Sequence, residues 1–193
     1  VHENPENLEG YRKHVARLLE MSEEEMLALV PEQSGIYFCD CPNCDAGHQE
    51  GQFALWGHMT FIPWSIDEPD VMRCKYCGHE YPSDDYPMNG VLEVHNPRGE
   101  IQRYPYWEDE NGYRHYFAAR IDYHKIRYME NAANLLARMY VISGEREFAR
   151  RAVLIIDRFA QVFPGYCYHF DYPFRDKVIY DGDVDPADFR PGF

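Results

Sequence analysis

Two helical patterns meet in the segment Arg138-Met139-Tyr140-Val141-Ile142-Ser143-Gly144-Glu145-Arg146-Glu147-Phe148-Ala149. Apolar residues recur at helical spacing from Ala118 to Ile142, and the same period resumes from Glu145 to Phe163. Ser143-Gly144 ends the first pattern, because glycine readily takes the left-handed conformation in which many helices end. Pro164-Gly165 ends the second pattern. The segment therefore predicts an antiparallel helical hairpin with a tight turn.

Two cysteine pairs lie upstream of this hairpin, Cys41-Pro42-Asn43-Cys44 and Cys74-Lys75-Tyr76-Cys77-Gly78. Each C-x-x-C pair places two thiols on one turn, and two such turns supply the four soft ligands that zinc prefers. The 29 residues between the pairs contain strand-like runs, which suits a zinc-ribbon hairpin. We therefore predict a structural zinc site with the ligands Cys41, Cys44, Cys74 and Cys77. A closed four-sulfur site leaves no position for substrate, so the metal is expected to stabilise the fold.

Other interpretations of the cysteines remain open at this point. The same four thiols would form two disulfides in a secreted protein, or would stay without metal. A redox-active C-x-x-C is disfavoured, because the βαβ setting of that motif is missing. Cys39 offers a substitute for Cys41, although the order Cys-Pro-x-Cys favours Cys41 as the ligand. Cys167 is interpreted as a small buried thiol.

The pattern along the chain predicts a mainly α fold with a small β insert. We expect helices in residues 1–34, a zinc-ribbon-like β insert in 35–86, an aromatic-rich loop or hairpin in 87–119, and helical hairpins in 120–193. One helix is predicted over residues 6–20, and Ser22 with Glu25 predicts a capping box at the start of the next. Within the insert, short strands are expected at 36–38, 52–56 and 59–62. Residues 181–193 look loop-like, and the chain is expected to be part of a longer protein.

Polar residues form a stripe on the predicted helix after Ala118. Its members recur every three or four residues and are Arg120, His124, Arg127, Asn131 and Asn134. Guanidinium groups bind carboxylates and sulfates through paired hydrogen bonds, so Arg120, His124 and Arg127 are candidate contacts for an anionic sugar. Nearby aromatic residues suit stacking against sugar rings and are Tyr104, Tyr106, Trp107, Tyr113, Tyr116 and Tyr123. A solvated helix face next to a loop-rich core explains the same pattern equally well.

Composition excludes several classes of protein. The chain has 193 residues, of which 45% are hydrophobic and 27% charged, as in ordinary globular domains. Its formal net charge of −14 opposes nucleic-acid binding. The longest aliphatic run, Ala152 to Ile156, is far shorter than the roughly 18 apolar residues of a membrane span. We find no glycine-rich phosphate loop, no G-x-S-x-G and no H-E-x-x-H.

Three parts of the sequence together resemble the N-terminal part of heparinase II/III-like polysaccharide lyases, in particular a bacterial subset with a zinc-ribbon insertion. They are Cys41 to Cys44, the run Cys74-Lys75-Tyr76-Cys77-Gly78-His79-Glu80-Tyr81-Pro82-Ser83-Asp84-Asp85-Tyr86, and Arg138 to Ala149. The likeness covers about residues 35–180 and implies that 120–193 begins an α/α toroid. It also implies cleavage of a uronic-acid-containing polysaccharide by β-elimination, and export to the periplasm or the exterior. The family's catalytic Asn or His and its Tyr match no position here, so the chain alone is expected to be inactive.

Two alternative functions follow from the same residues. A glycoside hydrolase built on the same toroid would also act on sugars, but by hydrolysis. A zinc-ribbon module that binds another protein, or a purely structural domain, would need no catalytic residues. Nucleic acid is the least suitable partner of such a module, since Arg73 and Lys75 stand among acidic residues near the cysteines.

Overall fold

The computed structural model describes residues 4–36, 39, 41–44, 48–49, 52–53, 62–110, 112–170 and 178–180. The strands expected at 36–38 and 59–62 fall mostly outside these residues, and the loop-like segment 181–193 falls wholly outside them. Of the strand expected at 52–56, only residues 52–53 are described, and they form a strand.

The predicted helical hairpin is confirmed. Helix α4 spans Phe117–Ser143, helix α5 spans Arg146–Val162, and a short 3₁₀ turn, η3, follows at Phe163–Gly165. Gly144 adopts a φ of 72°, and its N–H donates to the carbonyl of Tyr140 at 2.8 Å. A residue with a Cβ would be strained in this left-handed conformation, which is why the hairpin turns at a glycine.

The N-terminal helices pack against this hairpin. They are the 3₁₀ turn η1 (Pro5–Asn7) and the helices α1 (Leu8–His14), α2 (Ala16–Glu20) and α3 (Glu23–Ala28). The single helix predicted over 6–20 is interrupted at Val15, whose side chain is buried and whose backbone leaves the helical region. The capping box is confirmed, because Ser22 and Glu25 each accept a hydrogen bond from the backbone N–H of the other.

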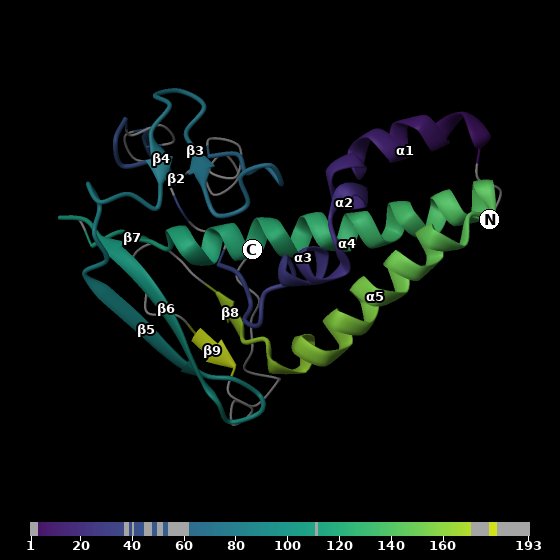
Figure 1. The fold of residues 1–193 in the computed structure, drawn as a ribbon. Coiled ribbons are helices and arrows are strands. Elements are labelled where there is room, and N and C mark those ends of the chain that lie inside the picture. Colours follow the sequence, from purple (N-terminus) through teal and green to yellow (C-terminus); the bar gives the residue numbers. More distant parts are fainter. Residues whose placement is uncertain are drawn as a thin grey trace.

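The helices share one hydrophobic core. Figure 1 shows α4 and α5 diverging from their turn, with α3 lying between them and α1 running above the second half of α4. Met26 of α3, Leu136 of α4 and Ile155 of α5 are buried together in this core. Arg151 of α5 ties the elements further, since its guanidinium donates to the carbonyls of Leu18 and Met21 at about 3 Å.

The remaining elements are antiparallel strands. They pair as β1 (His48–Gln49) with β2 (Gln52–Phe53), β3 (Met72–Arg73) with β4 (Glu80–Tyr81), and β8 (Tyr168–Phe170) with β9 (Val178–Tyr180). A larger sheet has the order β5 (Gly90–His95), β6 (Ile101–Glu108), β7 (Arg114–His115). Its inner residues Val94 and Tyr104 pack with Ala119 of α4 in a second core.

The predicted fold class is wrong. Within the described residues there is one long helical hairpin with short helices beside it, not a partial α/α toroid, and antiparallel sheets make the fold mixed α and β. The main strands, β5 and β6, come from 87–119, where we expected an aromatic-rich loop or hairpin, and they pair there as an antiparallel hairpin. Proline and glycine in this region suggested loop, whereas burial of Val94 and Tyr104 on one face of the sheet favours a strand pairing.

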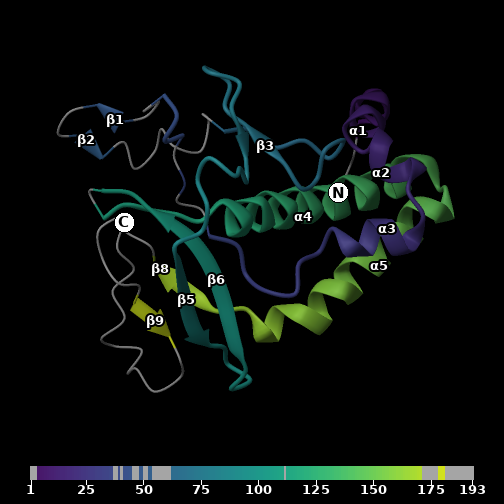
Figure 2. The same cartoon turned by 60° about the vertical axis from the view of Figure 1, so that its left-hand side comes forward.

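Helix α4 connects the separate parts of the molecule. Its first turns pack against the cysteine-rich hairpin β3–β4 and the sheet β5–β6–β7, while its second half belongs to the helical core. Figure 2 shows the strands gathered around the N-terminal end of α4, and α1, α2 and α3 around its other half. The long helix thereby fixes the cysteine hairpin relative to the helices.

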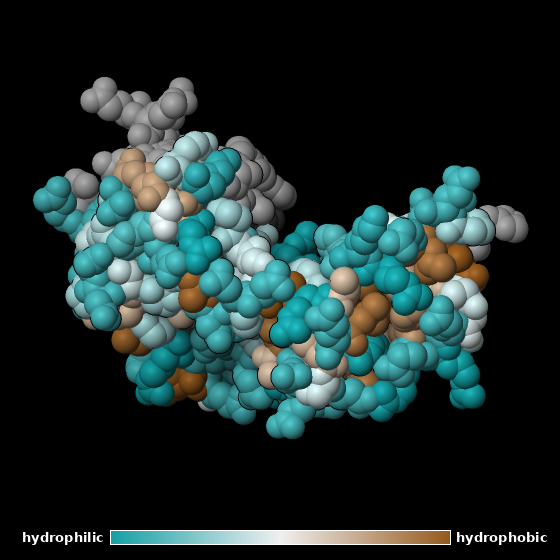
Figure 3. All heavy atoms as spheres, turned by 45° about the horizontal axis from the view of Figure 1, so that its top comes forward, coloured by the Kyte–Doolittle hydropathy of each residue, from teal (hydrophilic) through white to brown (hydrophobic). Residues whose placement is uncertain are grey.

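The described surface is mostly hydrophilic. Figure 3 shows that larger apolar patches on the displayed face lie over the helical side of the molecule. Among the described residues, no helix is both long and apolar enough to cross a membrane, in agreement with the sequence.

Candidate metal centre

The two C-x-x-C segments form tight turns that present their thiols. After β3, the N–H of Gly78 donates to the carbonyl of Cys74 at 2.9 Å. The N–H of Cys74 donates to the backbone carbonyl of His79, also at 2.9 Å. Gly78 has a φ of 75°, a conformation that glycine adopts without strain. Cys74 and Cys77 lie in the turn that joins β3 to β4.

The four predicted ligands come together. The Sγ atoms of Cys41, Cys44, Cys74 and Cys77 all lie within 4.8 Å of one another. Neighbouring sulfur atoms are 3.5 to 3.8 Å apart. A tetrahedral zinc site with bonds of about 2.3 Å would separate its sulfurs by about 3.8 Å. The cluster can therefore hold a metal ion without large movement of the chain.

Neither disulfides between these thiols nor the substitution of Cys39 for Cys41 appears among the described residues. No disulfide joins cysteines in the described part of the chain, and the sulfur separations exceed the roughly 2.05 Å of a disulfide bond. The metal-binding group contains Cys41 and not Cys39, which is buried in the adjacent hydrophobic cluster. Cys167 is buried far along the chain in the core under β5–β6, as expected for a small buried thiol.

The electrostatics of the cluster suit a cation. Burial raises the pKa of the Cys41 thiol, so in the absence of metal this thiol resists ionisation. At Cys77, hydrogen bonds from the His79 backbone, the Asn43 side chain and neighbouring thiols outweigh desolvation and lower the pKa to about 6. A divalent cation would stabilise the thiolate of both residues, because metal binding requires the deprotonated sulfur.

Aromatic residues close the buried side of the cluster. Cys41 and Cys74 are buried, whereas Cys44 and Cys77 are exposed. The buried thiols pack with Tyr81, Phe117 and Ile121. The metal centre therefore lies directly on the first turns of α4.

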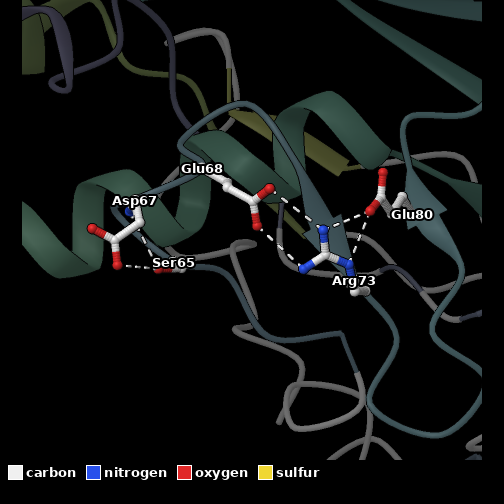
Figure 4. Close-up of polar contacts among 5 residues, drawn as sticks. All are labelled: Ser65, Asp67, Glu68, Arg73 and Glu80. Carbon is white, nitrogen blue, oxygen red and sulfur yellow. Dashed lines mark hydrogen bonds and ion pairs between the residues drawn. The ribbon is translucent and has the colours of Figure 1, made fainter.

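An exposed ion-pair cluster holds the β3–β4 hairpin to the loop before it. Figure 4 shows the guanidinium of Arg73 between the carboxylates of Glu68 and Glu80. Arg73 and Glu80 are paired in register across β3 and β4. Such exposed pairs contribute little stability individually, but they neutralise Arg73. One of the two basic residues near the cysteines is therefore already paired with carboxylates, which is unfavourable for nucleic-acid binding.

The polar stripe lies on α4 as predicted, but its residues do not share one exposed surface. Arg120 is 1% exposed, and its guanidinium lies 5.1 Å from the centre of the Tyr123 ring. His124 is largely buried beside Trp64, and its Nε2 has no hydrogen-bond partner among the described residues. Arg127 is exposed and forms an ion pair with Glu130 at 3.2 Å. The structure therefore does not bring Arg120, His124 and Arg127 together at one accessible position.

The rest of the stripe contacts other parts of the protein. The Asn131 side chain lies 3.0 Å from Nε2 of His14, and Asn134 accepts a hydrogen bond from Arg138 at 2.7 Å. Helical spacing identified the common side of α4, but it could not show that Arg120 and His124 at one end of the stripe are buried or half-buried, whereas Arg127, Asn131 and Asn134 are exposed.

Sequence reasoning also missed one residue at the metal centre, Tyr81. Its hydroxyl lies 3.1 Å from Sγ of Cys41. The only signal in the sequence was its place in the run from Cys74 to Tyr86, which carried the family resemblance.

Comparison of the chain with known proteins found no similar protein. No protein-family model, no curated protein and no solved structure matches the chain. The function is therefore argued from the site itself.

Proposed function

We propose that the four cysteines bind one zinc ion whose role is structural. The observation that carries this proposal is the approach of four sulfur atoms to within 4.8 Å of one another, from two separate turns. Four thiolates form a donor set that suits zinc, and they leave no open position for substrate. When bound, the ion would join the turn at 42–44 to the β3–β4 hairpin beside α4.

Metal content of the purified protein tests this proposal. We expect one equivalent of zinc in the wild type and loss of most of it in Cys74→Ser, which removes one ligand and leaves a hydroxyl that binds zinc poorly. Cys167→Ser is the matched control, because it changes a buried thiol in another core and should retain the metal. A wild type without metal after expression in zinc-supplemented medium, or Cys74→Ser with full zinc content, would contradict the assignment.

We also propose that the zinc-bearing chain is part of a polysaccharide lyase that acts on uronic-acid-containing polysaccharide. The support is the resemblance carried by Cys41 to Cys44, by Cys74 to Tyr86 and by the hairpin turn. In the structure, the rings of His79, Tyr81 and Tyr86 from the second segment pack together in one aromatic cluster. This cluster lies beside the candidate metal centre.

An assay for the unsaturated product of β-elimination tests the lyase proposal. The full-length protein that contains this chain is incubated with a panel of uronate polysaccharides, and the ultraviolet absorbance of the new double bond is followed. An increase in absorbance supports β-elimination. New reducing ends without absorbance would instead identify a hydrolase, and no reaction across the panel would contradict action on these polymers.

A further inference from the structure

Tyr81 contacts the metal centre through its hydroxyl. The residue lies on β4 opposite Met72, and its side chain is fully buried. Its Oη is 3.1 Å from Sγ of Cys41 and accepts a hydrogen bond from the N–H of Asn43 at 3.4 Å. A metal-bound thiolate carries no proton, so the hydroxyl is the donor in the contact with Cys41. The same hydroxyl therefore fixes the ligand and the turn that carries it.

The ring of Tyr81 contacts the long helix. It stacks on Phe117, the first residue of α4, with 4.6 Å between ring centres and an angle of 14° between the planes. The rings of His79 and Tyr86 flank it at 4.9 and 5.9 Å. Tyr86 in turn meets Trp107 of β6 at 4.9 Å. One side chain thus touches a metal ligand at one end and the start of α4 along its face.

We propose that Tyr81 is a positioning residue that orients Cys41 for the metal and couples metal binding to the first turn of α4. This inference rests on the zinc binding proposed above. Hydrogen bonds to metal ligands from outside the coordination shell fix ligand orientation, and their loss commonly weakens metal binding 10- to 100-fold. The burial of Tyr81 and of Cys41 strengthens this contact, because water does not compete for the sulfur.

The hydroxyl is tested with Tyr81→Phe, which keeps the ring and its stacking. Zinc affinity is measured by competition with a chromogenic chelator, and folding is checked by circular dichroism. We expect the dissociation constant for zinc to rise about 10- to 100-fold. Tyr166→Phe is the matched control, because it removes a tyrosine hydroxyl that donates to the carbonyl of Pro31 at 2.7 Å, away from the cysteines. Its zinc affinity should stay within about twofold of the wild type.

A spectroscopic measurement separates ligand orientation from general loss of stability. With Co²⁺ in place of zinc, the thiolate-to-cobalt charge-transfer band reports the electron density on the sulfurs. Loss of the hydrogen bond to Cys41 should shift this band in Tyr81→Phe and leave it unchanged in Tyr166→Phe. If Tyr81 had only a structural role, the charge-transfer band would be unchanged in both Tyr81→Phe and Tyr166→Phe.

The coupling to α4 is tested on the wild type by hydrogen exchange. Removal of zinc should speed exchange of amides in the first turns of α4, residues 120–124, and leave residues 129–139 protected. Phe117→Leu, which removes the stacked ring, should reduce this dependence on metal while changing zinc affinity little.

The possible outcomes separate the two proposals. A wild type that binds no zinc contradicts the proposed function. If the wild type binds zinc and Tyr81→Phe has the same zinc affinity and cobalt spectrum, the proposed role of the Tyr81 hydroxyl is wrong. The proposed zinc site itself then stands. Exchange in α4 that does not depend on zinc overturns the coupling.

Discussion

Asp122 and His124 are two buried titratable groups on α4 whose pKa values move in opposite directions. Burial, assisted by the positive charge of Arg120, lowers the pKa of His124 from 6.5 to about 4. Burial raises the pKa of Asp122 from 3.8 to about 6, although Lys125 and a hydrogen bond from Gln33 oppose this. Both shifts favour the neutral form of the side chain, as expected when the charged form loses its hydration.

These shifts predict how stability depends on pH. Between pH 6.5 and 4 the unfolded chain binds a proton at His124 and the folded protein does not, so the contribution of His124 to stability falls as the pH falls. The fall is about 3 kcal/mol over this range. His124→Gln removes it, so the difference in free energy of unfolding between wild type and variant should shrink by this amount from pH 6.5 to 4. Urea titrations at several pH values measure it.

Asp122→Asn provides a comparison of opposite sign. Its folded pKa lies above the unfolded value, so the wild type should lose stability relative to this variant as the pH rises from 4 to 6. Curves for either variant that run parallel to the wild type would show that the corresponding group does not titrate differently on folding.

At the scale of single elements, the turn between α4 and α5 depends on the left-handed backbone conformation of Gly144. A Cβ at Gly144 would meet no atom within 4 Å, but its φ of 72° strains any other residue. Gly144→Ala should therefore destabilise the protein by about 1 kcal/mol. Gly10→Ala is the matched control, because Gly10 lies inside α1, also has open space, and has no positive φ. It should stabilise by about 0.5 to 1 kcal/mol. Thermal unfolding shows whether each substitution raises or lowers the stability. If Gly144→Ala stabilises the protein, the turn does not require glycine at this position.

The elements that the sequence predicts well are those defined by local chemistry. Ser143-Gly144 marked the hairpin turn, Ser22 and Glu25 marked the capping box, and the C-x-x-C spacing marked the two turns that bring the four cysteines together. Each of these signals concerns residues close together in the chain. The break in the first helix at Val15 has no such signal, because it follows from packing against α4.

Long-range packing also explains the errors. The sequence predicts a loop or hairpin in 87–119, but not the long pairing of β5 with β6, in which Val94 and Tyr104 pack on α4. Arg120 is buried although arginine is usually exposed, and no spacing rule indicates this. The same applies to Tyr81, whose contact with Cys41 depends on the pairing of β3 with β4.

At the scale of the whole molecule, α4 contributes side chains to hydrophobic cores of different composition. The helical core is built from apolar side chains of α1 to α5, whereas the core around the cysteines is small and contains the buried thiols of Cys41 and Cys74. Small hydrophobic cores that include a metal site generally depend on the metal for stability. The two ends of α4 should therefore differ in their response to metal removal.

A chelator should destabilise the cysteine-rich end of the molecule and leave the helical end folded. After zinc removal, we expect amides of Met72, Cys74 and Tyr81 to exchange faster, because the thiols no longer share a ligand and the hairpin β3–β4 has only short strands. Amides from Met129 to Met139, in the helical core, should keep most of their protection, and the far-ultraviolet circular dichroism should change little. Re-addition of zinc should restore the exchange rates, whereas Mg²⁺, which prefers oxygen ligands, should not. Equal loss of protection at both ends would show that the molecule unfolds as a single unit, and unchanged exchange at Met72, Cys74 and Tyr81 would show that the metal does not stabilise this core.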